Sequence, residues 1–262
     1  MTQPDNQLGD AQPERGPGDG AAVPQHHAAT VRSAAQALAD AVTLGPFFAV
    51  CEEPGPDWVS WAELVDGDPL KRRISDVRAA LAAGPEVSDV DPRVAASIAH
   101  LGLVARLVSP LLGVALSGGV LPVAPPAGVR LLLAGGNPLP VALLEVRMVR
   151  AGEPDAVAAA LDREWLRPTV HPLSARVAAL TGLSRQVLDG NAVSAVAGAL
   201  RMAATARPSL AGAVGSVLDA VLTRGSLAGT GTRRDGGAFV RRSCCLFYRL
   251  PGAGTCGDCV LG

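Results

Sequence analysis

Four of the five cysteines of the chain lie close together near its C-terminal end. They are Cys244, Cys245, Cys256 and Cys259, with the spacing C-C-x10-C-x2-C. Thiols clustered in this way are typical of disulfides, of a zinc site or of an iron–sulfur cluster. The fifth, Cys51, is remote from them, and we expect it to be a small buried side chain.

Disulfides are the least favoured of these three. Neighbouring Cα atoms lie about 3.8 Å apart, which is below the usual disulfide range, so Cys244 and Cys245 would bond only under strain. The N-terminal residues also lack the charged and apolar regions of a signal peptide. We therefore expect a reducing, cytoplasmic location, in which structural disulfides are rare.

Zinc and iron–sulfur both stay open. Tetrahedral zinc usually draws on two C-x2-4-C pairs, and Cys256 and Cys259 supply one, with Gly257 allowing a tight turn. The side chains of Cys244 and Cys245 tend to diverge because they are adjacent. A two-iron cluster is wider and divides its four thiolates between two irons, so this spacing favours it over zinc.

Three arginines close to the cysteines are candidates for tuning or binding: Arg241, Arg242 and Arg249. Cations beside a negatively charged cluster favour its reduced form and so raise its reduction potential. The same guanidinium groups could also clamp an anionic ligand. For any one of them, plain surface charge is the alternative interpretation.

Residues 241–259 resemble the C-terminal motif of the FhuF-type ferric siderophore reductase family. In that motif R-x-S-C-C-L-x-Y-R-x-P is followed by a glycine turn and C-G-D-C, and this sequence matches it. The resemblance implies a [2Fe–2S] cluster bound by Cys244, Cys245, Cys256 and Cys259. It is fainter over about residues 91–225, where Gly190-Asn191 suggests close helix packing or approach to a ligand.

The resemblance also implies a function: one-electron reduction of ferric iron in a siderophore complex, which releases ferrous iron. The implied partners are a ferric siderophore and an electron donor. No catalytic acid or base stands out, and outer-sphere electron transfer needs none. Two other functions stay open, namely an iron–sulfur electron carrier or sensor without an iron-chelate substrate, and a zinc-stapled helical binding module without redox activity.

Composition narrows the remaining choices. The chain has 262 residues and a formal net charge of −1, so no basic field suggests nucleic acid. Four Phe, three Trp and one Tyr are too few for a platform that stacks bases. No glycine-rich nucleotide-binding motif is present. Few lysines, with many Ala, Gly, Arg and Pro residues, favour a GC-rich bacterial source.

The sequence predicts a mainly α fold: a helical body with one small β-hairpin and a C-terminal iron–sulfur-binding segment. Helices are expected at about 29–43, 69–84, 92–117, 155–165, 171–182, 185–205 and 208–224, with a helical turn from Ser60. The hairpin joins 129–133 to 141–146. The predicted parts are a disordered tail (1–28), a helical body that would bind the siderophore (29–237) and the cluster segment (238–262), with a flexible link at 225–237.

Residues 107–129 carry no charge, which raises the question of a membrane span. Pro110 and the later prolines and glycines would break a spanning helix, so we expect a buried core helix and no membrane span. Arg106 lies in this apolar setting, where a guanidinium needs a partner or a ligand. We expect Arg106 to face a substrate cleft and His100 to be a core residue.

Overall fold

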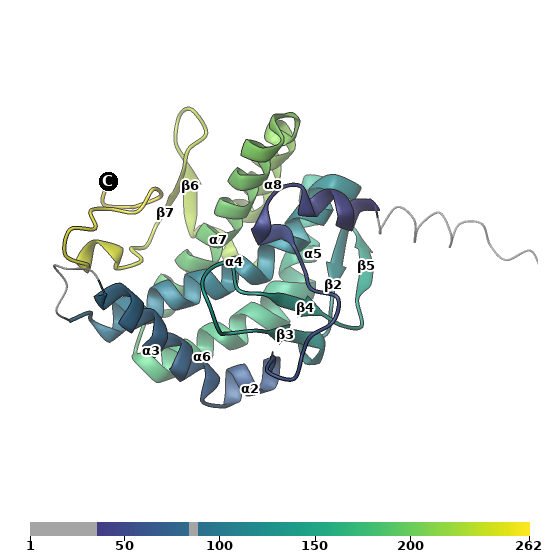
Figure 1. Cartoon of the computed structure of the whole chain (residues 1–262). Coiled ribbons are helices and arrows are strands. Elements are labelled where there is room, and N and C mark those ends of the chain that lie inside the picture. The colour runs from purple at the N-terminus through teal and green to yellow at the C-terminus, as the bar shows by residue number, and fades with distance from the viewer. Residues whose placement is uncertain (1–35, 84–88) are drawn as a thin grey trace, which may run out of the picture.

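The computed structural model describes residues 36–83 and 89–262. These residues are mainly helical with small sheets, which confirms the predicted fold class (Figure 1). The α-helices are α2 (Trp61–Asp66), α3 (Pro69–Ala82), α4 (Pro92–Gly118), α5 (Pro154–Leu161), α6 (His171–Thr181), α7 (Arg185–Ala206) and α8 (Ala211–Thr223). The predicted tail lies outside the described residues. So does the start of the first predicted helix, of which residues 36–42 are helical.

Helix starts follow from capping chemistry that the sequence shows. At α2, Ser60 Oγ accepts a hydrogen bond from the Glu63 N–H at 3.3 Å, and the Glu63 carboxylate accepts one from the Ser60 N–H at 2.8 Å. This is the predicted capping box. Asp91 Oδ1 accepts from the Arg93 N–H at 2.8 Å and so opens α4, and Ser184 caps α7 in the same manner.

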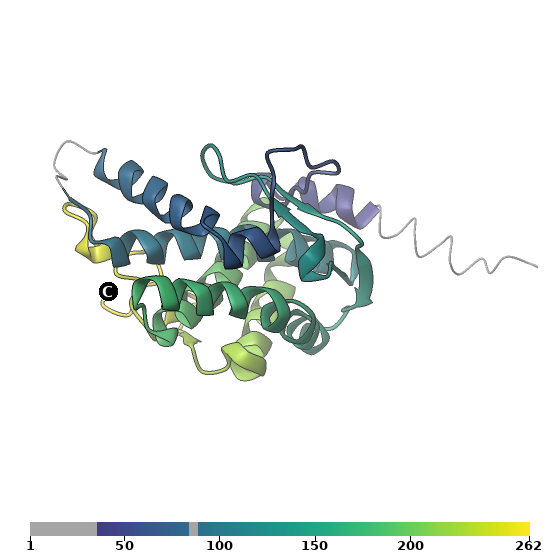
Figure 2. The same ribbon diagram turned by 90° about the horizontal axis from the view of Figure 1, so that it is seen from below.

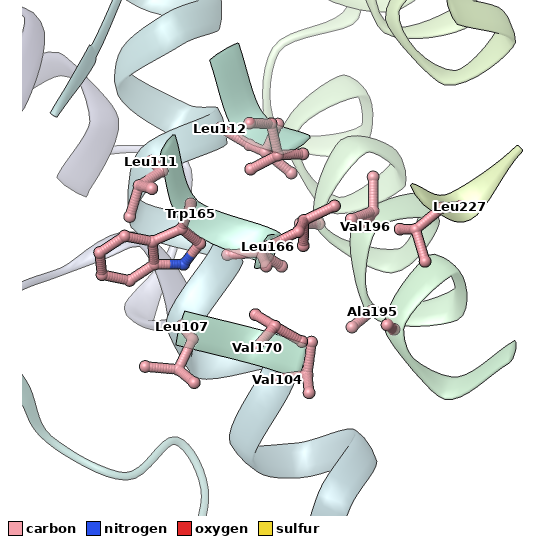
Figure 3. Close-up of a cluster of buried hydrophobic side chains, with 14 of the residues drawn as sticks. Val104, Leu107, Leu111, Leu112, Trp165, Leu166, Val170, Ala195, Val196 and Leu227 are labelled. Carbon is pink, nitrogen blue, oxygen red and sulfur yellow. The ribbon is translucent and has the colours of Figure 1, made fainter. Parts of the chain in front are cut away.

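Helix α4 runs through the middle of the protein, with α3 and α6 beside it and α7 packed across it (Figures 1 and 2). Figure 3 shows its apolar side chains against the other helices. By length and composition α4 could cross a membrane, but 78% of its most apolar window is buried inside the protein. It continues through Pro110, which removes only one backbone hydrogen bond, because packing holds the helix from several sides.

The chain stays helical from α5 to α6, where the sequence predicted a break near residue 165. A π-helix, η3 (Asp162–Val170), joins the two α-helices. Trp165 and Val170 of this segment are fully buried against α4 and α7 (Figure 3). Pro168 lacks an N–H and lies inside η3, so an irregular helical turn accommodates it while the apolar packing continues.

Small antiparallel sheets flank the helices. The strands are β1 (Val59–Ser60), β2 (Val120–Val123), β3 (Val129–Leu131), β4 (Val141–Leu143), β5 (Arg147–Arg150), β6 (Gly231–Arg233) and β7 (Phe239–Arg241). The β3–β4 pair is the predicted hairpin, and β1 extends it to a three-stranded sheet. The β2–β5 and β6–β7 pairs were not predicted. Cys51 forms a bridge with Ala142 beside the first sheet, and its side chain is exposed, so the expectation that it is buried was wrong.

The prediction of a flexible link at 225–237 was also wrong. A 3₁₀ turn, η5 (Gly225–Leu227), and strand β6 occupy this segment. A Cβ at Gly231 would lie 2.4 Å from Phe239 Cε2, so a glycine there lets the Phe239 ring pack over the strand. Pairing with β7 therefore orders a segment whose composition suggested flexibility, and β7 leads directly into the cysteine motif. The predicted domain limits stay a prediction. The β6–β7 hairpin crosses the limit that we predicted between residues 237 and 238.

The C-terminal segment docks on the beginning of α4. Leu250 packs with Val90, Val94 and Ala95 in a small apolar cluster separate from the main core. The same segment contains the 3₁₀ turn η6 (Phe247–Arg249), drawn in yellow beside α3 in Figure 1. This contact fixes the cysteine motif against the helical body.

Candidate metal centre

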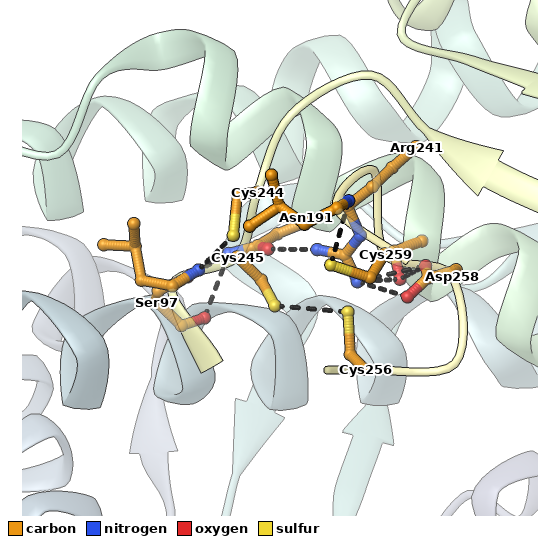
Figure 4. A network of polar contacts seen from close by, with 11 residues as sticks. Ser97, Asn191, Arg241, Cys244, Cys245, Cys256, Asp258 and Cys259 are labelled. Atoms are coloured by element: carbon orange, nitrogen blue, oxygen red, sulfur yellow. Dashed lines mark hydrogen bonds and ion pairs between the residues drawn. The ribbon is translucent and has the colours of Figure 1, made fainter. Parts of the chain in front are cut away.

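The four C-terminal cysteines come together beside α4 and α7 (Figure 4). The Sγ atoms of Cys245 and Cys256 are 3.5 Å apart. Cys245 and Cys259 are buried, Cys244 and Cys256 are partly exposed, and all four are free thiols. The structure thus places side by side the four residues that the sequence singled out.

Two tight backbone turns arrange these sulfurs. Leu246 has a left-handed backbone conformation, with φ of 69°, and its N–H donates to Cys244 Sγ at 3.3 Å. In the second turn the Cys259 N–H donates to the Cys256 carbonyl at 3.1 Å, and the Leu261 N–H donates to Cys259 Sγ at 3.3 Å. Such N–H groups favour a negatively charged sulfur, as metal-binding thiolates require.

A buried ion pair joins the two halves of the motif. Arg241 Nη2 lies 2.9 Å from Oδ1 and 3.0 Å from Oδ2 of Asp258, and the Arg241 backbone N–H donates to the Asp258 carbonyl at 3.1 Å. Arg241 precedes Cys244 closely in the chain, and Asp258 lies between Cys256 and Cys259. The pair therefore holds the two cysteine turns together (Figure 4).

The same arginine anchors both turns to the helical body. Its Nη1 donates to Asn191 Oδ1 at 2.9 Å, and Asn191 Nδ2 donates to the Oγ and the carbonyl of Ser97 at 2.9 and 3.0 Å. Ser194 Oγ accepts from Arg241 Nη2 at 2.6 Å and donates to Asp258. These bonds link α4, α7 and both cysteine turns in one polar network.

Burial and hydrogen bonding oppose each other in this network. Burial would raise the pKa of Asp258, but hydrogen bonds from Arg241 and Ser194 outweigh it and lower that pKa. Burial would lower the pKa of Arg241, but the hydrogen bonds and charge of Asp258 raise it. Both groups are therefore charged at neutral pH. Burial raises the pKa of the Cys244 and Cys256 thiols, so both stay protonated at neutral pH until a metal displaces the proton.

Three observations test whether these residues fit an iron–sulfur cluster. Two buried donors, Arg241 Nε and Ser243 Oγ, find no partner among the described residues, and a sulfur acceptor would satisfy them. The 3.5 Å between the Cys245 and Cys256 sulfurs is close to the roughly 3.8 Å between two thiolates on one tetrahedral ion. In residues 36–83 and 89–262, no three His, Cys, Asp or Glu side chains lie in a position to hold one metal ion together. The arrangement suits ligands divided between two irons better than one zinc.

Residues 241–261 match the family model of the FhuF 2Fe-2S C-terminal domain. The matched segment, residues 241–261, is called the FhuF-type domain after this similarity. The match confirms the resemblance predicted from the cysteine motif, and with it a [2Fe–2S] cluster as the cofactor. It covers the C-terminal segment alone and contains all four cysteines and the Arg241–Asp258 pair. No curated protein matches the chain.

The arginines of the FhuF-type domain occupy three different environments. Arg241 is 1% exposed within its network. Arg242 is exposed, and its side chain makes no ion pair with a described residue. Arg249 is also exposed; its Nη1 lies 3.3 Å from Asp91 Oδ2, and its guanidinium lies 5.9 Å from the centre of the Tyr248 ring. Only Arg241 is fixed by several partners beside the cysteines.

Arg106 lies outside the FhuF-type domain and is almost fully buried in α4. Its guanidinium donates to the carbonyls of Leu139, Phe47 and Ala49, the last at 2.9 Å. Burial lowers its pKa to about 10, so the side chain stays charged at neutral pH. These carbonyls supply the partners that a buried guanidinium needs. Its contacts therefore indicate a structural clamp, and a role towards substrate stays a prediction.

Two residues that support the FhuF-type domain from the helices were not predicted from the sequence. Ser97 and Ser194 stand at positions that local patterns do not mark. Gly190 and Asn191 were noticed, and their close packing is confirmed. A Cβ at Gly190 would lie only 1.9 Å from Ser243 Oγ, so this helix approaches the cysteine motif very closely.

A cavity of about 280 Å³ opens beside the FhuF-type domain. Cys256, Arg241 and Asp258 form part of its wall. Gly257, Phe47, Phe239 and residues of α4 and α7 form the rest. A molecule in this cavity would touch a cysteine of the motif without unfolding any element.

Proposed function

We propose that the protein is a cytoplasmic [2Fe–2S] protein that reduces ferric iron in siderophore complexes by one-electron transfer and so releases ferrous iron. Cys244, Cys245, Cys256 and Cys259 hold the cluster in this proposal. The observation that carries it is the cavity of about 280 Å³ whose wall includes Cys256. An electron carrier needs an exposed cluster edge, whereas a reductase also needs a place for its substrate.

The sulfur positions support a division of the ligands. The 3.5 Å separation favours Cys245 and Cys256 on one iron, which leaves Cys244 and Cys259 for the other. Since Cys256 is partly exposed and lines the cavity, its side of the centre is where the substrate would approach. Cys245 and Cys259 are buried, so each proposed pair has one buried ligand and one partly exposed ligand.

The protein's own groups would favour electron storage. The N–H groups of Leu246 and Leu261 point at cysteine sulfurs, and Arg241 Nε is a further buried donor. The two N–H groups at cysteine sulfurs would interact more strongly with the more negative, reduced state, and so would raise the reduction potential. A bound cluster would supply one electron to the ferric ion, and an external one-electron donor would restore its reduced state. Ferrous iron has a lower charge and binds oxygen donors less tightly, which releases the metal.

Mixing the reduced holoprotein with ferric siderophores under anaerobic conditions tests this proposal. Cluster oxidation is followed by visible absorbance and ferrous iron by a colorimetric chelator. We expect about one ferrous ion for each reduced cluster, as a one-electron step requires. A protein that a small outer-sphere oxidant reoxidises, but that no ferric siderophore reoxidises, is an electron carrier or a sensor, and the reductase proposal is then wrong.

A variant that fills the cavity shows whether the substrate binds there. Gly198 lines the cavity, and a Cβ at this position would meet nothing within 4 Å, so Gly198→Phe places a ring in the space without a backbone clash. We expect slower reduction of ferric siderophores with an unchanged cluster spectrum and an unchanged rate with a small oxidant. Gly212→Phe is the matched control, since Gly212 is exposed on α8 outside this cavity and is equally uncrowded.

A further inference from the structure

Three hollows meet at one arginine of α7. Arg201 is exposed and lines the cavity beside Cys256, a second hollow of about 280 Å³ and a third of about 300 Å³. The second lies against η1 (Pro46–Phe48), and the third lies between α8 and the β6–β7 hairpin. Arg201 is the residue common to all three.

The hollows adjoin one another because they share walls. Phe47 and Met202 line both the first and the second, and Phe239 and Gly257 line both the first and the third. Each hollow alone is at the small end of ligand sites, which enclose roughly 300–1,000 Å³. Together they form one groove along α7, with Arg201 near its middle, and the whole groove is of the size that a metal chelate needs.

The charges that line this groove favour an anion. Asp258 is its one acidic residue among the described residues, and Arg241 already balances it. Arg233 lines the third hollow but is paired with Asp219 at 2.7 Å. Within residues 36–83 and 89–262, no hydrogen bond or ion pair engages the Arg201 side chain. Its charge is therefore available to a ligand.

The remaining wall is apolar and contains aromatic rings. Phe47, Phe48 and Phe239 line parts of the groove, and most of the other positions are alanine or glycine. Small side chains allow flat ligand arms to lie against the helix, and aromatic rings favour stacking with such arms. Arg201 presents a planar group that can bind oxyanions through two parallel hydrogen bonds.

We propose that Arg201 selects the substrate of the groove, and that the groove prefers ferric chelates with a net negative charge, such as catecholate or hydroxycarboxylate complexes, over neutral hydroxamate complexes. This inference rests on the proposed reductase function. The bound cluster is itself negatively charged and repels an anionic chelate beside Cys256. A guanidinium with no other partner, placed at the junction of the three hollows, offsets that repulsion.

Redox-inert gallium(III) complexes measure the preference without the electron-transfer step. The oxidised holoprotein is titrated by calorimetry with an anionic gallium tris-catecholate and with a neutral gallium tris-hydroxamate. Arg201→Gln should weaken binding of the anionic complex about tenfold, the effect of losing a charged hydrogen bond that is partly open to solvent. Binding of the neutral complex should change less than twofold, and Arg201→Lys should retain most of the affinity for the anion.

Arg150→Gln is the matched control, because Arg150 is exposed on β5 outside the groove. It should leave both affinities unchanged. Equal affinities of the wild-type protein for the two complexes, or an Arg201→Gln protein that binds the anion as well as the wild type does, would overturn the inference. If the wild-type protein still reduces ferric siderophores after either of these results, the reductase proposal stands and only the role of Arg201 is refuted. If the wild-type protein binds neither gallium complex and reduces no ferric chelate, the proposed function fails and takes the inference with it.

Discussion

Removing the charge of Asp258 should destabilise the protein far more than removing the charge of a surface carboxylate. Asp258→Asn keeps the shape of the side chain but leaves the Arg241 guanidinium, which is 1% exposed, without its counter-ion. Breaking one partner of a buried ion pair costs about 3–5 kcal/mol, whereas an exposed pair contributes up to about 1 kcal/mol. The amide oxygen still accepts one hydrogen bond, so we expect a loss of about 3 kcal/mol. For a chain of this size that lowers the melting temperature by roughly 6–12 °C.

The control is Asp68→Asn. Asp68 and Lys71 form an ion pair of similar length, 2.9 Å, but their side chains are 68% and 53% exposed. We expect Asp68→Asn to leave the free energy of unfolding almost unchanged, because solvent screens an exposed pair. Unfolding is followed by far-ultraviolet circular dichroism in anaerobic urea, and iron and sulfide are measured on the same samples. Asp258→Asn should also retain less cluster, since Asp258 lies between Cys256 and Cys259.

A double-mutant cycle separates the ion pair from packing. Arg241→Met and Asp258→Leu each leave one buried charge, but the double variant leaves none, so it should be less destabilised than the sum of the two single variants. We expect a coupling of at least about 2 kcal/mol. Additive effects, or equal small losses in Asp258→Asn and Asp68→Asn, would refute the view that this ion pair holds the cysteine turns together.

Three further predictions concern the helical body. Gly190→Ala places a Cβ 1.9 Å from Ser243 Oγ, so it should lower the iron content per chain. The double variant Gly190→Ala/Ser243→Gly should restore the iron content. A Gly190→Ala protein with full iron content would contradict this prediction. His100 is fully buried, and burial lowers its pKa to about 3, so it stays neutral in the folded protein at pH 4.5. In the unfolded chain the same histidine takes up a proton below about pH 6.5. From pH 7 to 4.5 the wild type should therefore lose about 3 kcal/mol more stability than His100→Met, as measured by urea unfolding, and equal losses would refute this. Arg106→Met should cost about 3 kcal/mol through the unpaired carbonyls and leave the KM for ferric siderophores unchanged, whereas a raised KM would support the substrate role predicted from sequence.

Local chemistry made much of the helical body predictable. Asp91 followed by proline marks the start of α4, and Ser184 marks that of α7, because capping depends on residues within one turn. The cysteine motif was also recognisable from the sequence, because it is defined by the spacing of nearby residues. The polar network was not predictable, because Asn191 and Arg241 are 50 positions apart and meet only in the folded protein.

Three parts of the chain differ from the structure predicted for them because contacts with distant residues decide their conformation or exposure. Strand β6 is rich in glycine and polar residues, and its pairing with β7 and the ion pair of Arg233 with Asp219 on α8 order it. Segment η3 contains Pro168, and the packing of Trp165 keeps it helical. Cys51 is small and apolar in character, yet it lies at the surface beside a sheet. In each case contacts with distant parts of the chain outweigh the local preference.

The three arginines near the centre differ in how far neighbouring carboxylates balance their charge. Arg241 was expected to raise the potential through its charge, but Asp258 compensates that charge, so its net electrostatic effect at a distance is small. Its Nε–H is buried and has no hydrogen-bond partner among the described residues. Arg249 is likewise balanced by Asp91, whereas Arg242 has no carboxylate partner in the described part of the chain. A tuning role for Arg242 therefore stays a prediction, and its charge is the one that no described carboxylate balances. Arg241 is bound to Asn191, Ser194 and Asp258, so its replacement should weaken the docking of the segment on the helices.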